Sequence, residues 1–192
     1  MGGGRSELAA GDGLYPLVTR LIYLNGTSSA GKSSLAEELQ PLLEQPFLFF
    51  SIDTLLYTLP PGELEAVKGK ASYKRELDWN SLFSGYFACV RSLLDHGNLV
   101  IADCPVYNQE MAERYRKSLG DFEQIVKVKV DCPLEVAEQR ERERDDRTIG
   151  LARRQFRTVH QFLSYDLSVD TVKNCPQSAA ESLFAELSLR VR

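Results

Sequence analysis

The segment Gly26–Ser33, with the sequence GTSSAGKS, constrains the fold of this chain more than any other stretch. It matches the pattern G-x-x-x-x-G-K-[ST], in which the glycines allow backbone N–H groups to close around a phosphate. Lys32 then places a positive charge on the β- and γ-phosphates, and the hydroxyl of Ser33 can ligate Mg²⁺. A helix that begins near Gly31 directs its positive N-terminal end toward the same anion. The predicted phosphate-binding residues are Gly26, Thr27, Ser28, Ser29, Ala30, Gly31, Lys32, Ser33 and Ser34.

The residues on either side of this segment supply the structural context that such a short match needs. The preceding stretch Leu17–Leu24 is apolar and β-branched enough for a buried strand, at least from Leu21 onward. The following stretch Ser34–Leu43 places its leucines on one helical face. This order of strand, loop and helix favours a phosphate-binding loop over the alternative, which is a Ser/Gly-rich connection that binds nothing.

Strands alternate with helices along the rest of the chain, which predicts a mostly parallel five-stranded sheet with helices on both faces. The predicted fold class is therefore α/β with three layers. A single domain is expected over residues 16–192, after a flexible, Gly-rich tail over residues 1–15. The expected strands are Leu21–Leu24, Pro46–Ile52, Leu99–Ala102, Gln124–Val130 and Leu167–Asp170. The expected helices are Ser34–Leu43, Asn80–Asp95, Gln109–Leu119, Leu134–Glu143, Arg153–Leu163 and Ser178–Leu189, with a short helical or turn segment at Thr54–Leu59.

Charge and composition argue against several classes of protein. The formal net charge of -4 and the pI near 5.3 argue against a nucleic-acid-binding protein. No apolar run approaches the ~20 residues of a membrane-spanning helix, and no secretory signal is recognisable. The 4 cysteines form no C-x-x-C pair and there are only 2 histidines, so neither a disulfide framework nor a zinc site is expected. Widely spaced thiols of this kind are typical of a cytoplasmic protein.

Two aspartates follow predicted strands and should meet the phosphate-binding loop at the carboxyl edge of the sheet, where ligands bind in such folds. Asp53 can orient an acceptor hydroxyl beside a γ-phosphate and accept its proton, or it can cap the helix that follows; its position leaves both interpretations open. Asp103 can hold Mg²⁺ through water, contact a substrate or cap the turn before Pro105. Ser33 and Asp103 are thus the candidate metal-binding residues.

The segment 140–147, with the sequence RERERDDR, is dense in both kinds of charge. Arginine forks can neutralise the charge that spreads over a transferring phosphoryl group, and Arg144 and Arg147 are the candidates for this role. The alternative is a solvated helix with ion pairs between residues three and four positions apart. For Arg140 and Arg142 the solvated face is the favoured interpretation.

The acceptor side of such a site is less clearly marked in the sequence. Residues 62–78 are polar and weakly patterned, which predicts a surface excursion near the substrate. Trp79, Tyr73 and Tyr86 flank this side, although aromatic residues in such positions more often belong to the core. His160 has no neighbour that marks it as a catalytic base, so a packing or hydrogen-bonding role is expected.

Several further motifs follow the loop in a fixed order. They are Leu24–Ser34, Ser51–Leu55, Val130–Pro133, Arg144–Gly150, Gln155, Val159–His160 and Tyr165–Thr171. Together they resemble the chloramphenicol phosphotransferase-like proteins, and the similarity covers nearly all of the chain from Leu21 to Thr171. The broader resemblance is to small P-loop kinases such as adenylylsulfate kinases, shikimate kinases and zeta-type toxins.

This resemblance implies the three-layer fold of P-loop NTPases and kinases, with ATP and Mg²⁺ as cofactors and transfer of the γ-phosphoryl group to a hydroxyl of a small molecule. The family's catalytic aspartate corresponds to Asp53, and its lid arginines correspond to the segment Arg144–Arg147, in a lid around residues 140–150. Asp145 stands where the family commonly has glycine. Thr171 is implied to lie near the adenine. The implied catalytic residues are Lys32, Asp53, Arg144 and Arg147.

The identity of the acceptor stays open at this stage. The family's acceptor-side residues are poorly matched between Pro60 and Asn80, and Asp103 is followed here by CPVY. Chloramphenicol, a related antibiotic and an unknown metabolite are all candidates. The alternatives are a nucleotide-binding regulatory protein without transfer, and a toxin-like kinase that acts on a nucleotide-sugar or a protein. Neither nucleic acid nor membrane is an expected partner, while the choice between ATP and GTP and the formation of a homo-oligomer are left open.

Overall fold

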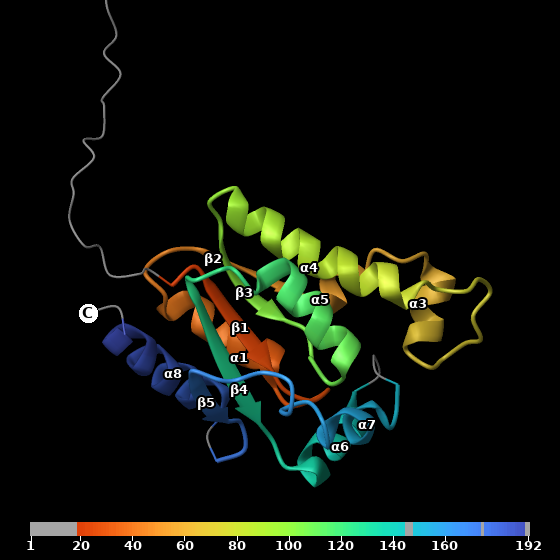
Figure 1. Cartoon of the computed structure of the whole chain (residues 1–192). Helices are drawn as coiled ribbons and strands as arrows, with labels where there is room; N and C mark the ends of the chain where they lie inside the picture. The colour runs from red at the N-terminus through yellow and green to blue at the C-terminus, as the bar shows by residue number, and fades with distance from the viewer. Residues whose placement is uncertain (1–18, 145–147, 174, 191–192) are drawn as a thin grey trace, which may run out of the picture.

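The computed structural model describes residues 19–144, 148–173 and 175–190 (Figure 1). The tail predicted over residues 1–15 therefore lies outside the described residues. The strands are β1 (Leu21–Asn25), β2 (Phe47–Ser51), β3 (Leu99–Asp103), β4 (Ile125–Asp131) and β5 (Leu167–Asp170). The helices are α1 (Lys32–Leu39), the 3₁₀ turn η1 (Gln40–Leu42), α2 (Ile52–Leu56), α3 (Pro61–Val67), α4 (Trp79–Asp95), α5 (Gln109–Leu119), α6 (Leu134–Glu143), α7 (Leu151–Phe156) and α8 (Pro176–Arg190).

The five strands form one parallel sheet in the order β2-β3-β1-β4-β5. β1 is the central strand, and all of its residues are buried. Since all the strands run in the same direction, their carboxyl ends meet at one edge of the sheet. Gly26 follows β1 there, Asp103 ends β3, and Ser51 at the end of β2 pairs in register with Asp103. The predicted parallel α/β sheet is confirmed.

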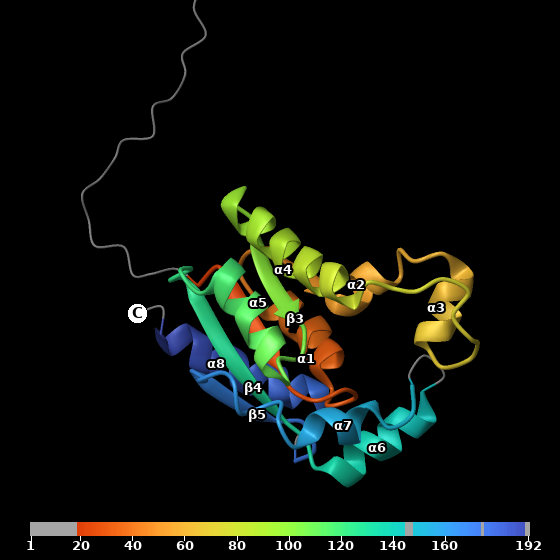
Figure 2. The same ribbon diagram turned by 45° about the vertical axis from the view of Figure 1, so that its right-hand side comes forward.

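Helices cover both faces of this sheet and give the three layers (Figures 1 and 2). α1 and α8 pack together on one face, in a core that includes Ile22 and Leu24 of β1. α4 and α5 pack together on the other face, in a core that includes Leu21 and Tyr23 of the same strand. Alternate residues of β1 thus enter different cores, as the pleat of a strand buried on both faces requires.

Most predicted elements are confirmed, and Gln109–Leu119 and Leu167–Asp170 have the predicted bounds. Local side-chain contacts account for several boundaries. The carboxylate of Asp78 accepts a hydrogen bond from the backbone N–H of Ser81 at 3.1 Å and caps the start of α4. Gly97 ends the same helix with a φ of 88°, in the left-handed region that glycine adopts without strain.

The structure differs from the predicted elements at two places. The surface excursion over residues 62–78 contains a helix that was not predicted, α3, which begins at Pro61, because proline suits the first turn of a helix, where its missing N–H is not needed. The helix expected over Arg153–Leu163 is the shorter α7, followed by hydrogen-bonded turns, so His160 lies in a turn.

Candidate active site

The phosphate-binding loop between β1 and α1 has a tightly curved backbone. Gly31, at the N-cap of α1, has a φ of 93°, and Ser29 has a φ of 59°. A Cβ atom at Gly26 would lie 2.6 Å from the carbonyl oxygen of Val130, so only glycine fits there. Ser29 Oγ is buried and has no hydrogen-bond partner among the described residues. An orphaned buried hydroxyl in a loop of this curvature is suited to a phosphate oxygen.

The ammonium group of Lys32 forms hydrogen bonds with the backbone of the loop. Lys32 is 7% exposed, and its Nζ donates hydrogen bonds to the carbonyl oxygens of Gly26, at 3.0 Å, and Thr27, at 2.8 Å. The same Nζ lies 3.6 Å from Oδ1 of Asp103, which is also buried. The structure therefore brings together the predicted lysine and the carboxylate at the end of β3, where each buried charge compensates the other.

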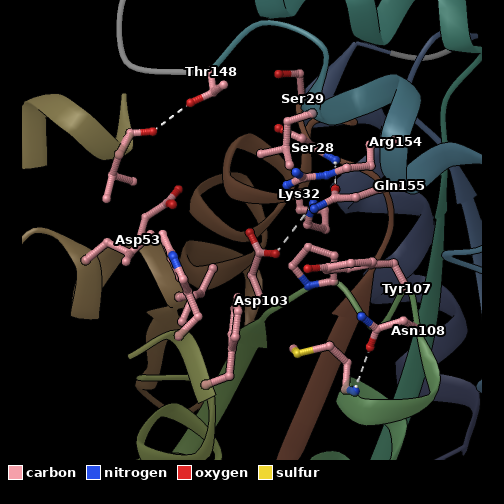
Figure 3. A pocket seen from close by; sticks show the side chains of 18 of the residues that line it. Ser28, Ser29, Lys32, Asp53, Asp103, Tyr107, Asn108, Thr148, Arg154 and Gln155 are labelled. Carbon is pink, nitrogen blue, oxygen red and sulfur yellow. Dashed lines mark hydrogen bonds and ion pairs between the residues drawn. The ribbon is translucent and has the colours of Figure 1, made fainter. Parts of the chain in front are cut away.

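Asp53 lies in the first turn of α2, and a different residue caps that helix. Ser51 Oγ accepts a hydrogen bond from the backbone N–H of Thr54 at 3.2 Å, and Thr54 Oγ1 accepts one from the N–H of Ser51 at 3.4 Å. This reciprocal pair is a capping box, so the interpretation of Asp53 as a helix cap is wrong. The side chain of Asp53 instead lines a cavity together with Lys32 and Asp103 (Figure 3).

This cavity has a volume of about 650 Å³ and lies at the carboxyl edge of the sheet. One end is formed by residues of the phosphate-binding loop and the start of α1. The other end is mainly apolar and is formed by α2, α3, α4 and the segment after β3. The apolar and aromatic residues that line the cavity are Ile52, Leu56, Val67, Tyr73, Trp79, Phe83, Pro105 and Tyr107, with Met111 from α5 and Leu151 from α7. Trp79 and Tyr73 thus line the cavity as the sequence suggested, whereas Tyr86 is fully buried in the core.

Polar groups at the apolar end come from α4 and α5. Arg114 Nη2 donates a hydrogen bond to Asn80 Oδ1 at 2.6 Å, and its Nη1 lies 3.6 Å from a carboxylate oxygen of Glu110. Asn108 caps α5 by accepting from the N–H of Met111 at 2.8 Å. These residues were not predicted from the sequence. The spacing of four between Glu110 and Arg114 on a predicted helix could have indicated that their side chains form a pair.

Thr148, which lies between α6 and α7, also lines this cavity. Thr148 Oγ1 donates a hydrogen bond to the carbonyl oxygen of Val67 at the end of α3, at 2.7 Å (Figure 3). Arg144 lines the cavity as predicted. Arg147 and Asp145 lie outside the described residues, and the predicted lid stays a prediction.

α7 is docked directly on the phosphate-binding loop. The N–H of Ser28 donates to Gln155 Oε1 at 2.8 Å, and Thr27 Oγ1 donates to the carbonyl oxygen of Ala152 at 2.9 Å. Gln155 and Ala152 are both buried. Gln155 is among the residues that carry the family resemblance, and its contact gives it a role in holding the loop.

Glu141 of α6 is buried although it lies in a highly charged segment. It is 1% exposed, and its two carboxylate oxygens accept hydrogen bonds from the N–H groups of Gly150, at 2.7 Å, and Ala152, at 2.8 Å. The interpretation of residues 140–147 as a solvated helix is therefore wrong for this position. Glu141 instead joins α6 to the start of α7.

Arg140 also departs from the favoured interpretation as a solvated residue. Its guanidinium donates to the carbonyl oxygen of Thr171 at 3.0 Å and to Oγ1 of the same residue at 3.4 Å. Thr171 Oγ1 in turn donates to the carbonyl oxygen of Ala30 in the phosphate-binding loop, at 2.6 Å. These residues border a second hollow of about 260 Å³, which Gly31 and Arg144 also line. Arg142 is exposed, as predicted.

Burial controls the ionisation of several groups near the site. Burial raises the pKa of the Cys104 thiol well above its usual value, so this residue stays a neutral thiol beside Asp103. Burial also raises the pKa of Tyr107, an effect that the positive charge of Arg154 partly opposes. Burial lowers the pKa of His160, whose Nδ1 lies 2.8 Å from the hydroxyl oxygen of Tyr165, so the expected hydrogen-bonding role is confirmed.

The fold and the loop at its strand edge define a P-loop kinase. The family model for chloramphenicol phosphotransferase-like proteins matches residues 19–188. A Mycobacterium tuberculosis (strain CDC 1551) protein named "Putative O-phosphotransferase" is 31% identical over 183 residues, which cover 85% of this chain and 80% of that protein. An adenylyl-sulfate kinase from Gloeothece citriformis is 35% identical over 124 residues, covering 62% of this chain and 63% of that protein.

A solved structure gives the same result for the fold. The APS kinase of Mycobacterium tuberculosis in complex with AMPPNP and APS has a TM-score of 0.62 at 18% identity, covering 90% of this chain and 98% of that one. The chain belongs to the chloramphenicol phosphotransferase-like family, as its motifs indicated, and is an enzyme of the phosphotransferase type. Within the described ranges, no helix has the length and apolar character needed to cross a membrane.

Proposed function

We propose that this enzyme transfers the γ-phosphoryl group of ATP to a hydroxyl of a small molecule that has an apolar, ring-containing body. The observation that carries the proposal is the position of Asp53, whose carboxylate shares one cavity with Lys32 and the phosphate-binding loop (Figure 3). The AMPPNP complex of the APS kinase that shares this fold supports ATP as the donor. The name of the 31% identical relative supports an oxygen atom as the acceptor.

The donor side fits a magnesium-bound nucleoside triphosphate. The curved backbone of the loop offers N–H groups as hydrogen-bond donors to phosphate oxygens, and the buried hydroxyl of Ser29 is a further donor. Ser33 and Asp103 supply the oxygen atoms that Mg²⁺ prefers, and the described residues contain no cluster of three or more metal-ligating side chains. A metal held by few protein oxygens and by phosphates and water is typical of Mg²⁺ in kinases, where it neutralises phosphate charge. The second hollow, which Arg140 and Thr171 both line, is our candidate adenine site.

The mechanism follows from the residues at the two ends of the cavity. Asp53 accepts a hydrogen bond from the acceptor hydroxyl and orients its oxygen toward the γ-phosphorus. As the new O–P bond forms, the bond from the γ-phosphorus to the bridging oxygen breaks, ADP leaves and the hydroxyl proton passes to Asp53. Lys32 and, in the predicted lid, Arg144 and Arg147 compensate the negative charge of the phosphates. Closure of the predicted lid over the phosphates would exclude water, which would otherwise hydrolyse ATP.

The wall opposite the loop restricts the class of acceptor. Trp79 and Phe83 stack with ring centroids 5.9 Å apart and an interplanar angle of 29°, and they present a flat apolar surface to the cavity. Arg114 and Asn80 add a small number of polar groups at its rim. A pocket of this kind favours a flat ring system with few hydroxyls over a polyhydroxylated sugar. Chloramphenicol belongs to the favoured class.

The substitution Asp53→Asn tests the proposal. It keeps the size of the side chain but removes the proton acceptor, so transfer should fall by about 10²-fold or more while ATP binding is kept. The assay measures label from γ-³²P-ATP on chloramphenicol and on a panel of aromatic and sugar alcohols, with mass spectrometry of the products. Asp95→Asn, a surface aspartate paired with Arg91 far from the cavity, is the matched control. Near-normal turnover by Asp53→Asn would contradict the proposed role.

A second variant separates this proposal from its competitors. Lys32→Ala should abolish transfer and weaken nucleotide binding together, because Lys32 braces the loop and carries charge to the phosphates. Saturable ATP binding without a phosphorylated product from any acceptor would instead indicate a regulatory protein. Growth arrest on expression, relieved by Asp53→Asn, would indicate a toxin-like kinase.

A further inference from the structure

Two consecutive arginines of α7 have different surroundings. Arg153 is tied to α6, since its Nε lies 2.5 Å and its Nη2 lies 2.9 Å from the two carboxylate oxygens of Glu138. Arg154 lines the main cavity instead. No described residue forms an ion pair or hydrogen bond with its guanidinium. Neither the motifs nor the family resemblance marked Arg154 for a role.

The backbone that carries Arg154 is fixed relative to the phosphate-binding loop. The next residue, Gln155, holds the N–H of Ser28, and Ala152 holds the hydroxyl of Thr27. On its other side, the start of α7 is held by the buried carboxylate of Glu141. None of these contacts involves Arg144 or Arg147, the predicted lid arginines. The backbone at Arg154 is therefore held against the phosphate-binding loop by the contacts of Gln155 and Ala152.

The side chain of Arg154 extends from α7 into the cavity on the side of Ser28 and Ser29, whereas Asp53 lies on the opposite side of Lys32 in the same view (Figure 3). Its positive charge also acts on Tyr107, which lines the same cavity, and opposes the effect of burial on the pKa of that residue. Arg154 thus places a positive charge in the cavity beside the third residue of the loop, with Asp53 across the same cavity.

We propose that Arg154 is a catalytic residue that contacts the γ-phosphoryl group during transfer, in addition to the predicted lid arginines. This inference rests on the proposed function. As the acceptor oxygen bonds to phosphorus and the bond to the ADP oxygen breaks, negative charge spreads over the oxygens of the transferring group. The guanidinium fork donates hydrogen bonds to those oxygens, while the hydroxyl proton still passes to Asp53. Because α7 is already docked, this donor is in place before the acceptor arrives.

Nucleotide binding tests this proposal without knowledge of the acceptor. Arg154→Gln should weaken the binding of AMPPNP by about tenfold or more in calorimetry, because one charge-assisted contact to the γ-phosphate is lost. Binding of ADP, which lacks that phosphate, should change by less than about twofold. Arg154→Lys keeps the charge without the planar fork and should give an intermediate loss. Arg153→Gln, the neighbouring arginine bound to Glu138, is the matched control and should bind both nucleotides as the unaltered protein does.

The outcomes separate this inference from the proposed function. If the unaltered protein binds neither nucleotide, the proposed function fails. If it binds both and Arg154→Gln loses no affinity for AMPPNP, or loses equal affinity for AMPPNP and ADP, the assignment of Arg154 to the γ-phosphoryl group is overturned. With chloramphenicol or another identified acceptor, Arg154→Gln should lower kcat by about 10³-fold, while the KM for the acceptor stays within a few-fold.

Discussion

The buried carboxylate of Glu141 gives a sharp prediction about stability. Glu141→Gln keeps the size of the side chain, but the amide has only one oxygen for the two N–H groups that the carboxylate accepts, at 2.7 Å and 2.8 Å. One N–H of Gly150 or Ala152 then faces an NH₂ group in a site that is 1% exposed. A hydrogen bond to a charged group contributes about 1.5–3 kcal/mol, so the free energy of unfolding should fall by about 2–3 kcal/mol.

Urea denaturation followed by circular dichroism measures this change. With a slope of about 2 kcal/mol per molar urea, the unfolding midpoint should fall by about 1–1.5 M. Glu138→Gln is the matched control, since it makes the same substitution on the same helix but loses an ion pair with the largely exposed Arg153, and such pairs contribute about 0–1 kcal/mol. A Glu141→Gln midpoint within about 0.2 M of the Glu138→Gln midpoint would refute the reasoning.

Two further predictions concern packing and ionisation. Gly26→Ala should destabilise the protein by about 1–3 kcal/mol and weaken AMPPNP binding, because the added Cβ would lie 2.6 Å from the carbonyl oxygen of Val130. Gly85→Ala is the control. Gly85 lies in α4 with open space around it, so this substitution should reduce neither the stability nor the affinity for AMPPNP. For His160, burial and then the charge of Lys129 lower the pKa in the folded protein below the usual value of about 6.5. The imidazole is therefore neutral in both the folded and the unfolded protein well above that pH. As the pH falls, the unfolded protein takes up the proton first, which favours unfolding. Stability from pH 7 to pH 5 should therefore decline less in His160→Gln than in the unaltered protein, and parallel urea midpoints for the two across this range would contradict the lowered pKa.

The sequence predicted the donor side of the site well because its signals are local. The loop motif, the strand before it and the helix after it lie within one short stretch, and the structure has all three. The two interpretations of Asp53 could not be separated from position alone, because the choice depends on where β2 ends. The strand ends at Ser51, so a serine is available to cap α2, and the carboxylate of Asp53 is left for the cavity.

The contacts of Glu141 and Arg140 could not be predicted, because their partners lie outside their own helix and are partly backbone atoms. A charged residue in a run such as RERERDDR fits a solvated helix until the path of the chain after α6 is known. Glu141 binds backbone N–H groups 9 and 11 residues further on, and Arg140 binds a residue that is 31 positions away. Spacing rules for a single helix contain no information about such contacts.

The two ends of the cavity come from different stretches of the chain, and this has a consequence for how acceptor choice can change. The contacts that hold the phosphate-binding loop come from residues 26–34, 103 and 140–171, whereas much of the aromatic wall comes from residues 52–83. A chimaera that exchanges residues 52–83 with those of a relative, keeping Asp53, retains every hydrogen bond described here for the loop. Such an exchange replaces much of the aromatic wall as one contiguous block and leaves the contacts of the phosphate-binding loop in place, while residues 105–114 keep their part of the lining.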